Sequence, residues 1–256
     1  MGTVKVDDLC FGYDKRSVFN GLSVEFHKGD FCTIMGLNGS GKTTLLKCIT
    51  GLLKPSSGTV MIDGKDIGAY SVREKAKHIA YVSQYQELVF EISVRDYVMM
   101  GRNPYQRPWS MAEESDTEVV EEAMRRCNVS QFQDTMMQSL SGGERQRAMI
   151  ARAIAQQTDI LILDEPLSNI DITHKFEIMD ILEELNRGRG VTILIVLHDL
   201  PIAVQYSKQI LLLKDGRMEQ FGDKNAVLTE ENIRKCFGLD KRYKISKEGF
   251  VVKEIL

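Results

Sequence analysis

The sequence has no long hydrophobic run. Its 256 residues are 43% apolar and 27% charged, but its apolar stretches are as short as Val191–Leu197, which itself contains a threonine. A helix needs roughly 18 apolar residues to cross a bilayer, and Met1–Asp8 lacks the apolar core of a secretory signal. We therefore expect a soluble protein without a membrane span. Glycine and proline occur in ordinary proportions, 20 and 5 residues, which excludes collagen-like and disordered chains.

The sequence also lacks paired cysteines, an excess of basic residues, internal repeats and low-complexity tracts. None of its five cysteines forms a C-x-x-C pair, so we expect reduced, buried thiols in a cytosolic chain and no zinc site. The chain has 33 Lys and Arg residues and 36 Asp and Glu residues, which gives a net charge of −3. This total gives no indication of a broad face that binds nucleic acid.

Short apolar runs separated by helical periods predict an α/β fold with a mostly parallel sheet. The predicted strands are Phe31–Met35, Thr59–Ile62, Ile79–Ser83, Ile160–Leu163, Val191–Leu197 and Ile210–Leu213. The predicted helices are Lys42–Gly51, Ser71–His78 and Ile172–Asn186, followed by a last helix through Cys236 that Thr229 would cap. Alternating apolar residues near the start of the chain predict half-buried strands, and Asp63–Gly64 and Asp215–Gly216 predict turns.

The segment between Tyr85 and Thr158 differs from the rest of the chain. It contains no convincing strand run, only helical periods such as Val94–Met100 and Asp116–Cys127. We therefore expect a helical insertion in the α/β domain.

A glycine-rich loop lies between the predicted strand Phe31–Met35 and the helix after it. It matches the P-loop pattern G-x-x-x-x-G-K followed by S or T, and its residues are Gly36, Leu37, Asn38, Gly39, Ser40, Gly41, Lys42, Thr43 and Thr44. Glycines let backbone N–H groups turn toward anionic oxygens, and the helix start adds partial positive charge. Lys42 would reach the β- and γ-phosphates, and the Thr43 hydroxyl would bind Mg²⁺. A chance match is expected in on the order of one chain per hundred of this size.

Two carboxylates end the apolar strand Ile160–Leu163. Adjacent strand residues point to opposite faces, so Asp164 and Glu165 can do different work. Asp164 would hold Mg²⁺ beside Thr43, and Glu165 would face the water that attacks the γ-phosphorus. The alternative, a solvated acidic strand end, is the weaker one because a P-loop lies upstream.

A third motif, Leu140–Gln146, opens a predicted helix with a serine and two glycines. A serine cap is common at a helix start, so Ser141 alone indicates only a capped helix. However, Gly142 and Gly143 each cost roughly 1 kcal/mol of helix stability relative to alanine. That cost is explained if the backbone here must approach a phosphate closely.

Together these motifs resemble the nucleotide-binding subunit of ABC transporters, whose signature is L-S-G-G followed by Q or E. The resemblance covers the chain from Tyr13 through the C-terminal hairpin. It implies a P-loop NTPase of the ABC-cassette fold, with a RecA-like parallel-sheet core, an antiparallel β layer and a helical subdomain. Residues 1–256 would form one ATPase domain, with the β layer and core in 1–85 and 159–256, and the helical subdomain in 86–158.

The resemblance also implies roles for single residues that otherwise look structural. Tyr13 matches the aromatic residue that stacks on adenine, and Gln84 the glutamine that contacts Mg²⁺ and water. His198 matches the histidine that contacts the γ-phosphate and orients Glu165. Asp171, in the segment that matches the D-loop, is equally plausible as the N-cap of the next helix. The chain departs from common family patterns at Ser83 and at Asn169-Ile170, but no catalytic group is lost.

In this family two subunits face each other head to tail around two ATP molecules. Ser141, Gly142 and Gly143 of one copy would contact the ATP bound by the other. We therefore expect ATP and Mg²⁺ as ligands, a homodimer, and separate transmembrane permease subunits that hold the ATPase at the cytoplasmic face of the membrane. An extracytoplasmic substrate-binding protein would take part indirectly, and no nucleic acid is expected.

Finer resemblance points to the ATPases of iron–siderophore, haem and cobalamin importers. It lies in the segments Ser71–Ala76, Ile79–Gln84, Met100–Tyr105 and Leu197–Leu200. ATPases of zinc, manganese and molybdate or tungstate importers are close relatives of these. A permease coupling helix would dock on the segment Gln84–Tyr105, whose apolar residues Leu88, Phe90 and Ile92 fit a core role equally well. An alternative is an ABC ATPase that acts on nucleic acid, ribosomes or cluster assembly.

Overall fold

The computed structural model describes residues 2–14, 16–84, 91–106, 113–168, 170–240, 243–246 and 251–253. The chain forms two compact units, one made of Met1–Ala69 with Thr192–Leu256 and the other of Tyr70–Val191. Within the described residues, no helix combines the length and apolarity that a bilayer crossing requires.

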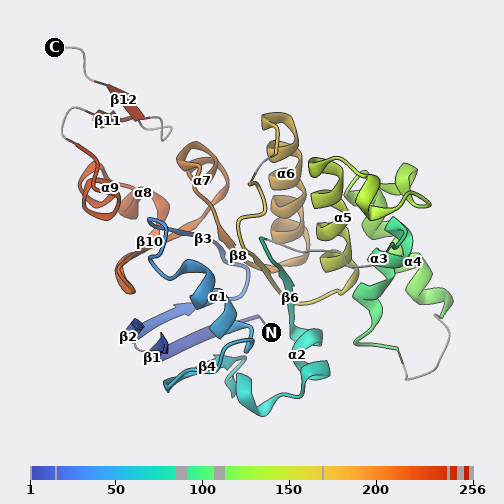
Figure 1. Cartoon of the computed structure of the whole chain (residues 1–256), viewed down its shortest axis with the longest axis horizontal. Coiled ribbons are helices and arrows are strands. Elements are labelled where there is room, and N and C mark those ends of the chain that lie inside the picture. Colours follow the sequence, from blue (N-terminus) through green and yellow to red (C-terminus); the bar gives the residue numbers. More distant parts are fainter. Residues whose placement is uncertain are drawn as a thin grey trace. The chain divides into compact units, whose positions relative to one another are not determined.

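An antiparallel sheet forms one layer of the first unit (Figure 1). Its strand order is β2-β1-β4-β5, and its strands are β1 (Val4–Tyr13), β2 (Arg16–Phe26), β4 (Ser57–Ile62) and β5 (Lys65–Asp66). Val4 of β1 lies opposite Phe26 on one side and Ile62 on the other, and all three side chains are fully buried. The alternation of apolar and polar residues therefore indicates the buried face correctly.

Parallel strands form the core of the same unit. The order there is β10-β9-β3-β8, and the strands are β3 (Phe31–Met35), β8 (Thr192–Val196), β9 (Gln209–Lys214) and β10 (Arg217–Asp223). β3 pairs in parallel with β8 and β9, and β10 is antiparallel to β9. Every residue of β3 and β8 is buried, as expected for parallel strands covered on both faces. The predicted turn joins β9 to β10, and Asp215 and Gly216 both have positive φ.

Helices of the first unit follow its strands. α1 (Lys42–Ile49) comes after β3 and the glycine-rich loop. The others are α7 (Leu200–Tyr206), α8 (Lys224–Val227) and α9 (Glu230–Phe237), with the hairpin β11 (Tyr243–Ile245) and β12 (Val251–Lys253) at the end. Thr229 caps α9, as predicted, by accepting the amide of Asn232 at 3.3 Å. The sequence patterns predict neither α7 nor α8, and the four residues of α8 are too few to show a helical period.

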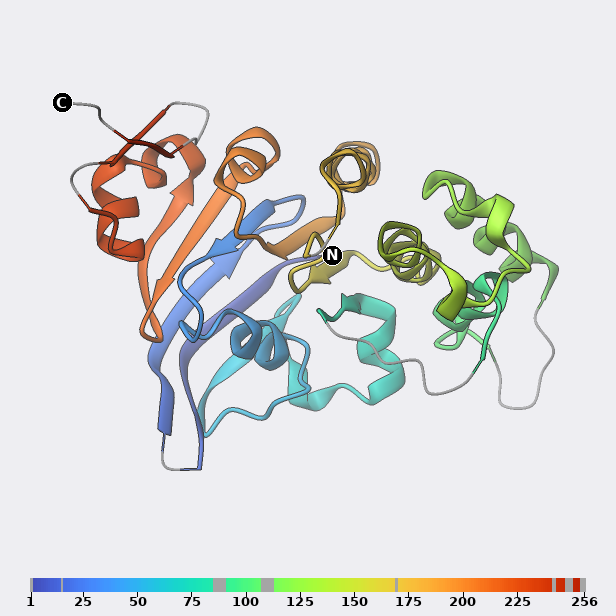
Figure 2. The same ribbon diagram turned by 45° about the horizontal axis from the view of Figure 1, so that its top comes forward.

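The second unit contains two parallel strands and most of the longer helices. β6 (Ile79–Val82) pairs with β7 (Ile160–Leu163). The helices are α2 (Val72–His78), α3 (Val94–Met99), α4 (Glu114–Arg126), α5 (Gly142–Ala155) and α6 (Ile172–Arg189). α6 runs three residues beyond the predicted Asn186 and ends at Gly190, whose φ of 66° suits a helix C-cap. Helices α3, α4 and α5 contact one another (Figure 2).

The described residues of 91–158 carry helices, 3₁₀ turns and one isolated bridge between Ser93 and Met136. This agrees with the helical periods of the sequence. The domain bounds that the resemblance implies, with 86–158 as a separate helical part, stay a prediction.

The cysteines agree with the prediction of reduced packing residues. All five are free thiols; four are buried and Cys10 is half-buried. Burial raises the pKa of the Cys48 thiol to about 11, so this thiol stays protonated and unreactive at neutral pH.

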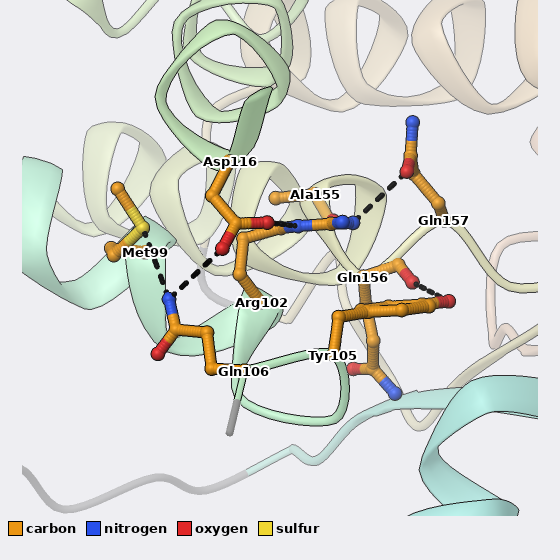
Figure 3. A network of polar contacts seen from close by, with 8 residues as sticks. All are labelled: Met99, Arg102, Tyr105, Gln106, Asp116, Ala155, Gln156 and Gln157. Atoms are coloured by element: carbon orange, nitrogen blue, oxygen red, sulfur yellow. Dashed lines mark hydrogen bonds and ion pairs between the residues drawn. The ribbon is translucent and has the colours of Figure 1, made fainter. Parts of the chain in front are cut away.

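The C-terminal end of α5 is anchored by the buried side chain of Arg102 (Figure 3). Its Nε donates to Asp116 Oδ1 at 2.8 Å, and its Nη1 donates to the Ala155 carbonyl and to Gln157 Oε1, both at 2.9 Å. Its guanidinium also lies 4.2 Å from the ring centre of Tyr105. A carbonyl at the end of α5, which lacks a partner within the helix, is satisfied in this way. The network thus fixes the helix that begins with the signature motif.

The Arg102–Asp116 pair should be far more important for stability than an exposed pair. Both side chains are less than 10% exposed, so Asp116→Asn leaves a buried guanidinium without its counter-charge. We expect a loss of about 3–5 kcal/mol in the free energy of unfolding, measured by urea denaturation.

The matched control is Glu122→Gln on the same helix. Glu122 pairs with Arg126 at 2.6 Å, but the side chains are 40% and 31% exposed. Its loss should cost less than about 1 kcal/mol. Equal losses in the two variants would contradict the assignment of Asp116 as the essential partner.

Candidate functional site

Two glycines of the loop between β3 and α1 combine a positive φ with a lack of room for a side chain. Gly36 and Gly41 have φ of 155° and 106°, which side-chain-bearing residues rarely adopt. A Cβ at Gly36 would lie 2.2 Å from the Leu213 carbonyl oxygen, and one at Gly41 would lie 2.8 Å from the Phe19 ring. The loop therefore curls tightly against β9 and β2, with its backbone close to both.

Two hydrogen-bond donors lie buried inside this loop. The Lys42 ammonium is on a residue only 5% exposed, and it donates to the carbonyls of Gly36 at 3.0 Å and Leu37 at 3.1 Å. The Ser40 hydroxyl is buried and has no hydrogen-bond partner, which is costly unless a ligand supplies one. A buried cation, an unsatisfied hydroxyl and a helix N-terminus together fit an anionic oxygen, as a phosphate would provide.

The other residues of the predicted P-loop fall on the loop tip and the first turn of α1. Asn38 and Gly39 are exposed, Thr43 is half-buried, and Thr44 is buried. The structure thus confirms the predicted strand–loop–helix context around the motif.

Tyr13 and His198 belong to the same unit as the loop. Tyr13 ends β1, is 48% exposed, and packs edge-on against Phe11 with ring centres 5.0 Å apart. Its ring is therefore accessible for stacking. His198 lies two residues after the end of β8 and is exposed. Their roles toward adenine and the γ-phosphate stay predictions.

A second cluster lies in the other unit, at the end of β7. Gln84 Nε2 donates to Glu165 Oε2 at 2.6 Å, and the Ser168 hydroxyl donates to the same oxygen at 3.2 Å. The structure therefore brings together two of the predicted residues, Gln84 and Glu165. Glu165 has a φ of 50°, a left-handed conformation that costs roughly 1–2 kcal/mol. Such strain is typical of functional sites.

Asp164, beside Glu165, is almost fully buried. It is 1% exposed and accepts the Tyr81 hydroxyl at 3.3 Å. Burial, and then the charge of Asp164, raise the pKa of Tyr81 well above its usual value, so the phenol stays protonated and donates. Sequence reasoning missed Tyr81, because only the pairing of β6 with β7 brings it to Asp164.

The signature motif begins α5 with Ser141 as the N-cap. Ser141 and Gly142 are exposed, whereas Gly143 is buried. The side chain of His174, in the first turn of α6, lies against Gly143, so that a Cβ there would be 3.1 Å from the imidazole. No local pattern in the sequence indicates His174, because the contact joins two helices that are distant in the chain.

Glu144 completes a capping box with Ser141. The Ser141 amide and hydroxyl both donate to Glu144 Oε2, at 2.8 Å and 2.7 Å. The S-x-x-E spacing is a known signal for this arrangement, and sequence reasoning missed it. Asp171 occupies the N-cap position of α6, as one alternative predicted, but its side chain makes no capping hydrogen bond. Asn169 lies outside the described residues.

Metal ligands were predicted at Thr43, Gln84 and Asp164. The described residues contain no group of three or more His, Cys, Asp or Glu side chains that could hold a metal. A hydroxyl, an amide and a carboxylate are nevertheless oxygen donors of the kind that Mg²⁺ prefers, since this ion takes most of its other ligands from phosphates and water. Each of these donors is therefore of a type that suits Mg²⁺; Thr43 belongs to the first unit, and Gln84 and Asp164 belong to the second.

A family model described as ABC transporter matches residues 19–168. The ferric enterobactin transport ATP-binding protein FepC of Escherichia coli is 37% identical over 91% of this chain and 86% of its own length. The petrobactin import ATP-binding protein FpuC of Bacillus anthracis is 35% identical, with coverage of 93% and 87%.

Solved structures agree with this similarity. A chain from an inward-facing transporter described as of metal-chelate type superposes with a TM-score of 0.83 at 29% identity, with 100% of this chain and 98% of that chain covered. The dimeric ATP-binding cassette MJ0796 bound to ADP and Pi superposes at 0.76 and 28% identity, with 86% and 98% covered. The expected ABC-cassette fold is thereby confirmed. The chain belongs to the ABC transporter family and is an ATPase of that family.

Proposed function

We propose that this chain is the ATP-hydrolysing subunit of an importer, and that two copies close around two ATP molecules to drive a separate permease. The observation that carries the proposal is the glycine-lined loop that encloses the Lys42 ammonium and the unsatisfied Ser40 hydroxyl. Both donors suit the β- and γ-phosphates of ATP.

Each predicted residue has a physical task in this proposal. Lys42, Ser40 and the loop amides hold the phosphates, and Tyr13 stacks on adenine. Glu165 accepts a proton from the attacking water, while Gln84 holds its carboxylate in place. His198 contacts the γ-phosphate. Thr43, Asp164 and Gln84 hold Mg²⁺, which when bound offsets charge on the phosphates.

The exposure of the signature motif supports the proposed dimer. Ser141 and Gly142 are open to solvent at the start of α5, where the backbone N–H groups of the helix start suit a phosphate presented by another molecule. A two-fold dimer uses the same surface of both copies and therefore has two equal ATP sites. In this proposal Asp171 lies next to these sites. Structures in the same fold family include dimers of an ATP-binding cassette. ATP favours closure only while its γ-phosphate is contacted from both copies, so hydrolysis favours opening.

The cargo and the partner are inferred from relatives. Their names specify import of petrobactin, ferric enterobactin transport and import of cobalamin. We propose iron–siderophore, haem, cobalamin or a related metal complex as the cargo, delivered by a substrate-binding protein. The permease would hold this ATPase at the cytoplasmic face of the membrane.

The permease would dock on the segment 84–105. Its residues Leu88 and Phe90 lie outside the described part of the chain, and Ile92 is half-buried. Farther on, the α3 side chains of Tyr97 and Val98 are core residues, whereas Met100 and Tyr105 are 37% and 36% exposed. This segment therefore has both a buried face and an accessible apolar surface.

Lys42→Ala tests the phosphate loop. Loss of one charged hydrogen-bond donor should weaken ATP binding by roughly 10- to 100-fold, measured by titration calorimetry. The exposed Lys54 provides a matched control, and Lys54→Ala should bind ATP as the unmodified protein does. Unchanged affinity in Lys42→Ala would contradict the assignment of the loop.

Glu165→Gln tests the base. An amide cannot accept the proton, so turnover should fall by about 10²- to 10⁴-fold while ATP still binds and a closed dimer accumulates. Steady-state phosphate release and size-exclusion chromatography with ATP measure the two effects. Glu118→Gln, at an exposed position of α4, should change neither. Rapid turnover by Glu165→Gln would overturn the role of this carboxylate.

Charge reversal at the exposed residue Glu91 tests the docking segment. Glu91→Lys should abolish ATP-driven uptake of a ferric siderophore in proteoliposomes that contain the co-purifying permease, and should spare basal ATPase activity. Glu118→Lys is the control, with normal uptake. Normal uptake by Glu91→Lys would favour the core interpretation of this segment.

A further inference from the structure

The Ser141 hydroxyl already has an acceptor inside its own chain. A serine hydroxyl carries a single hydrogen, and here Ser141 Oγ lies 2.7 Å from Glu144 Oε2. The Ser141 amide donates to the same carboxylate oxygen at 2.8 Å. Glu144 thus holds both of the hydrogens that Ser141 can donate.

Glu144 keeps its charge while it does so. The hydrogen bonds from the Ser141 hydroxyl and amide lower the pKa of Glu144 below its usual value. An ionised carboxylate is only an acceptor, and a hydrogen bond to it is stronger than one to a neutral group. The hydroxyl hydrogen therefore stays on the line between Ser141 and Glu144.

A γ-phosphate is also only an acceptor, so it must compete for that hydrogen. If the hydroxyl turns toward a phosphate, two oxygens 2.7 Å apart are left with no hydrogen between them, and Glu144 has to move away. Glutamine at this position would behave differently. Its oxygen could accept the Ser141 amide while its NH₂ donates to Ser141 Oγ, which leaves the hydroxyl hydrogen available.

We propose that Glu144 is a positioning residue that withholds the Ser141 hydroxyl from the ATP of the partner copy, and so weakens ATP-dependent dimerisation. The inference rests on the proposed function, in which Ser141 contacts that ATP. It predicts that the chain closes less tightly around ATP than it would with an amide at position 144.

A second capping box in the same chain provides the matched control. On α2, the Ser71 amide donates to Glu74 Oε2 at 2.7 Å, and the Glu74 amide donates to Ser71 Oγ at 3.2 Å. Both boxes close a helix start with the same residue pair, but only Ser141 belongs to the signature motif. Glu74→Gln therefore has the same effect on a helix cap without changing the signature.

The test compares dimer dissociation constants at saturating ATP by sedimentation equilibrium, in protein that carries Glu165→Gln to prevent turnover. Removing the competition at both sites of the dimer should make Glu144→Gln dimerise roughly ten-fold more tightly. Glu74→Gln should leave the constant unchanged, although both variants lose a capping carboxylate and should melt at similar temperatures. An unchanged or weaker dimer in Glu144→Gln would overturn the proposal.

Ser141→Ala separates competition for the hydroxyl from simple repulsion between a carboxylate and a phosphate. In the Ser141→Ala background, Glu144→Gln should have no further effect, because no hydroxyl is left to release. If Glu144→Gln tightens the dimer equally in the Ser141→Ala background, the proposal is overturned, and repulsion between the Glu144 carboxylate and the phosphate explains the effect. If Ser141→Ala also leaves the dimer of Glu144→Gln protein equally tight, the signature contact in the proposed function is wrong, and the role of Glu144 is wrong with it.

Discussion

A lysine ammonium buried inside a loop is the constraint on which the rest of this site depends. Lys42 is 5% exposed, and a buried cation is stable only if nearby oxygens surround it. In this chain the oxygens are the carbonyls of Gly36 and Leu37. The loop reaches this conformation only because residue 36 is a glycine, since a side chain there would collide with the Leu213 carbonyl. Lys42 is also the first residue of α1, so the partial positive charge of the helix start adds to that of the ammonium at the place where a phosphate would bind.

The carboxylates after β7 are held at defined positions by neighbouring side chains. Asp164 is buried against the protonated Tyr81 hydroxyl, and Glu165 is held by Gln84 and Ser168 in a left-handed conformation. Strand pairing supplies Tyr81, and the loop after β6 supplies Gln84. The strain at Glu165 is offset by these contacts, which orient a carboxylate that has water as its partner in the proposed reaction.

Local patterns in the sequence predict most helices, strands and turns, but they cannot predict contacts between segments that are distant in the chain. The run Phe31–Met35 and the glycines after it indicate a strand, a loop and a helix, because each signal lies within a few residues. The cap of α9 at Thr229 and the turn at Asp215 are predictable for the same reason. By contrast, His174 beside Gly143 depends on the packing of two helices. The Ser141–Glu144 box was predictable from its spacing but gains functional meaning only from the 2.7 Å contact of the hydroxyl.

The central claim is that two copies of the chain bind each ATP together. A disulfide bond across the expected interface tests this claim most directly. A Ser141→Cys chain is mixed with an Asn38→Cys chain, both carrying Glu165→Gln and lacking Cys10, the one cysteine that is not buried. Both positions are exposed in the single chain. The account predicts a covalent heterodimer that forms rapidly with ATP and slowly without it. Equal rates with and without ATP, or no covalent dimer at all, would contradict it.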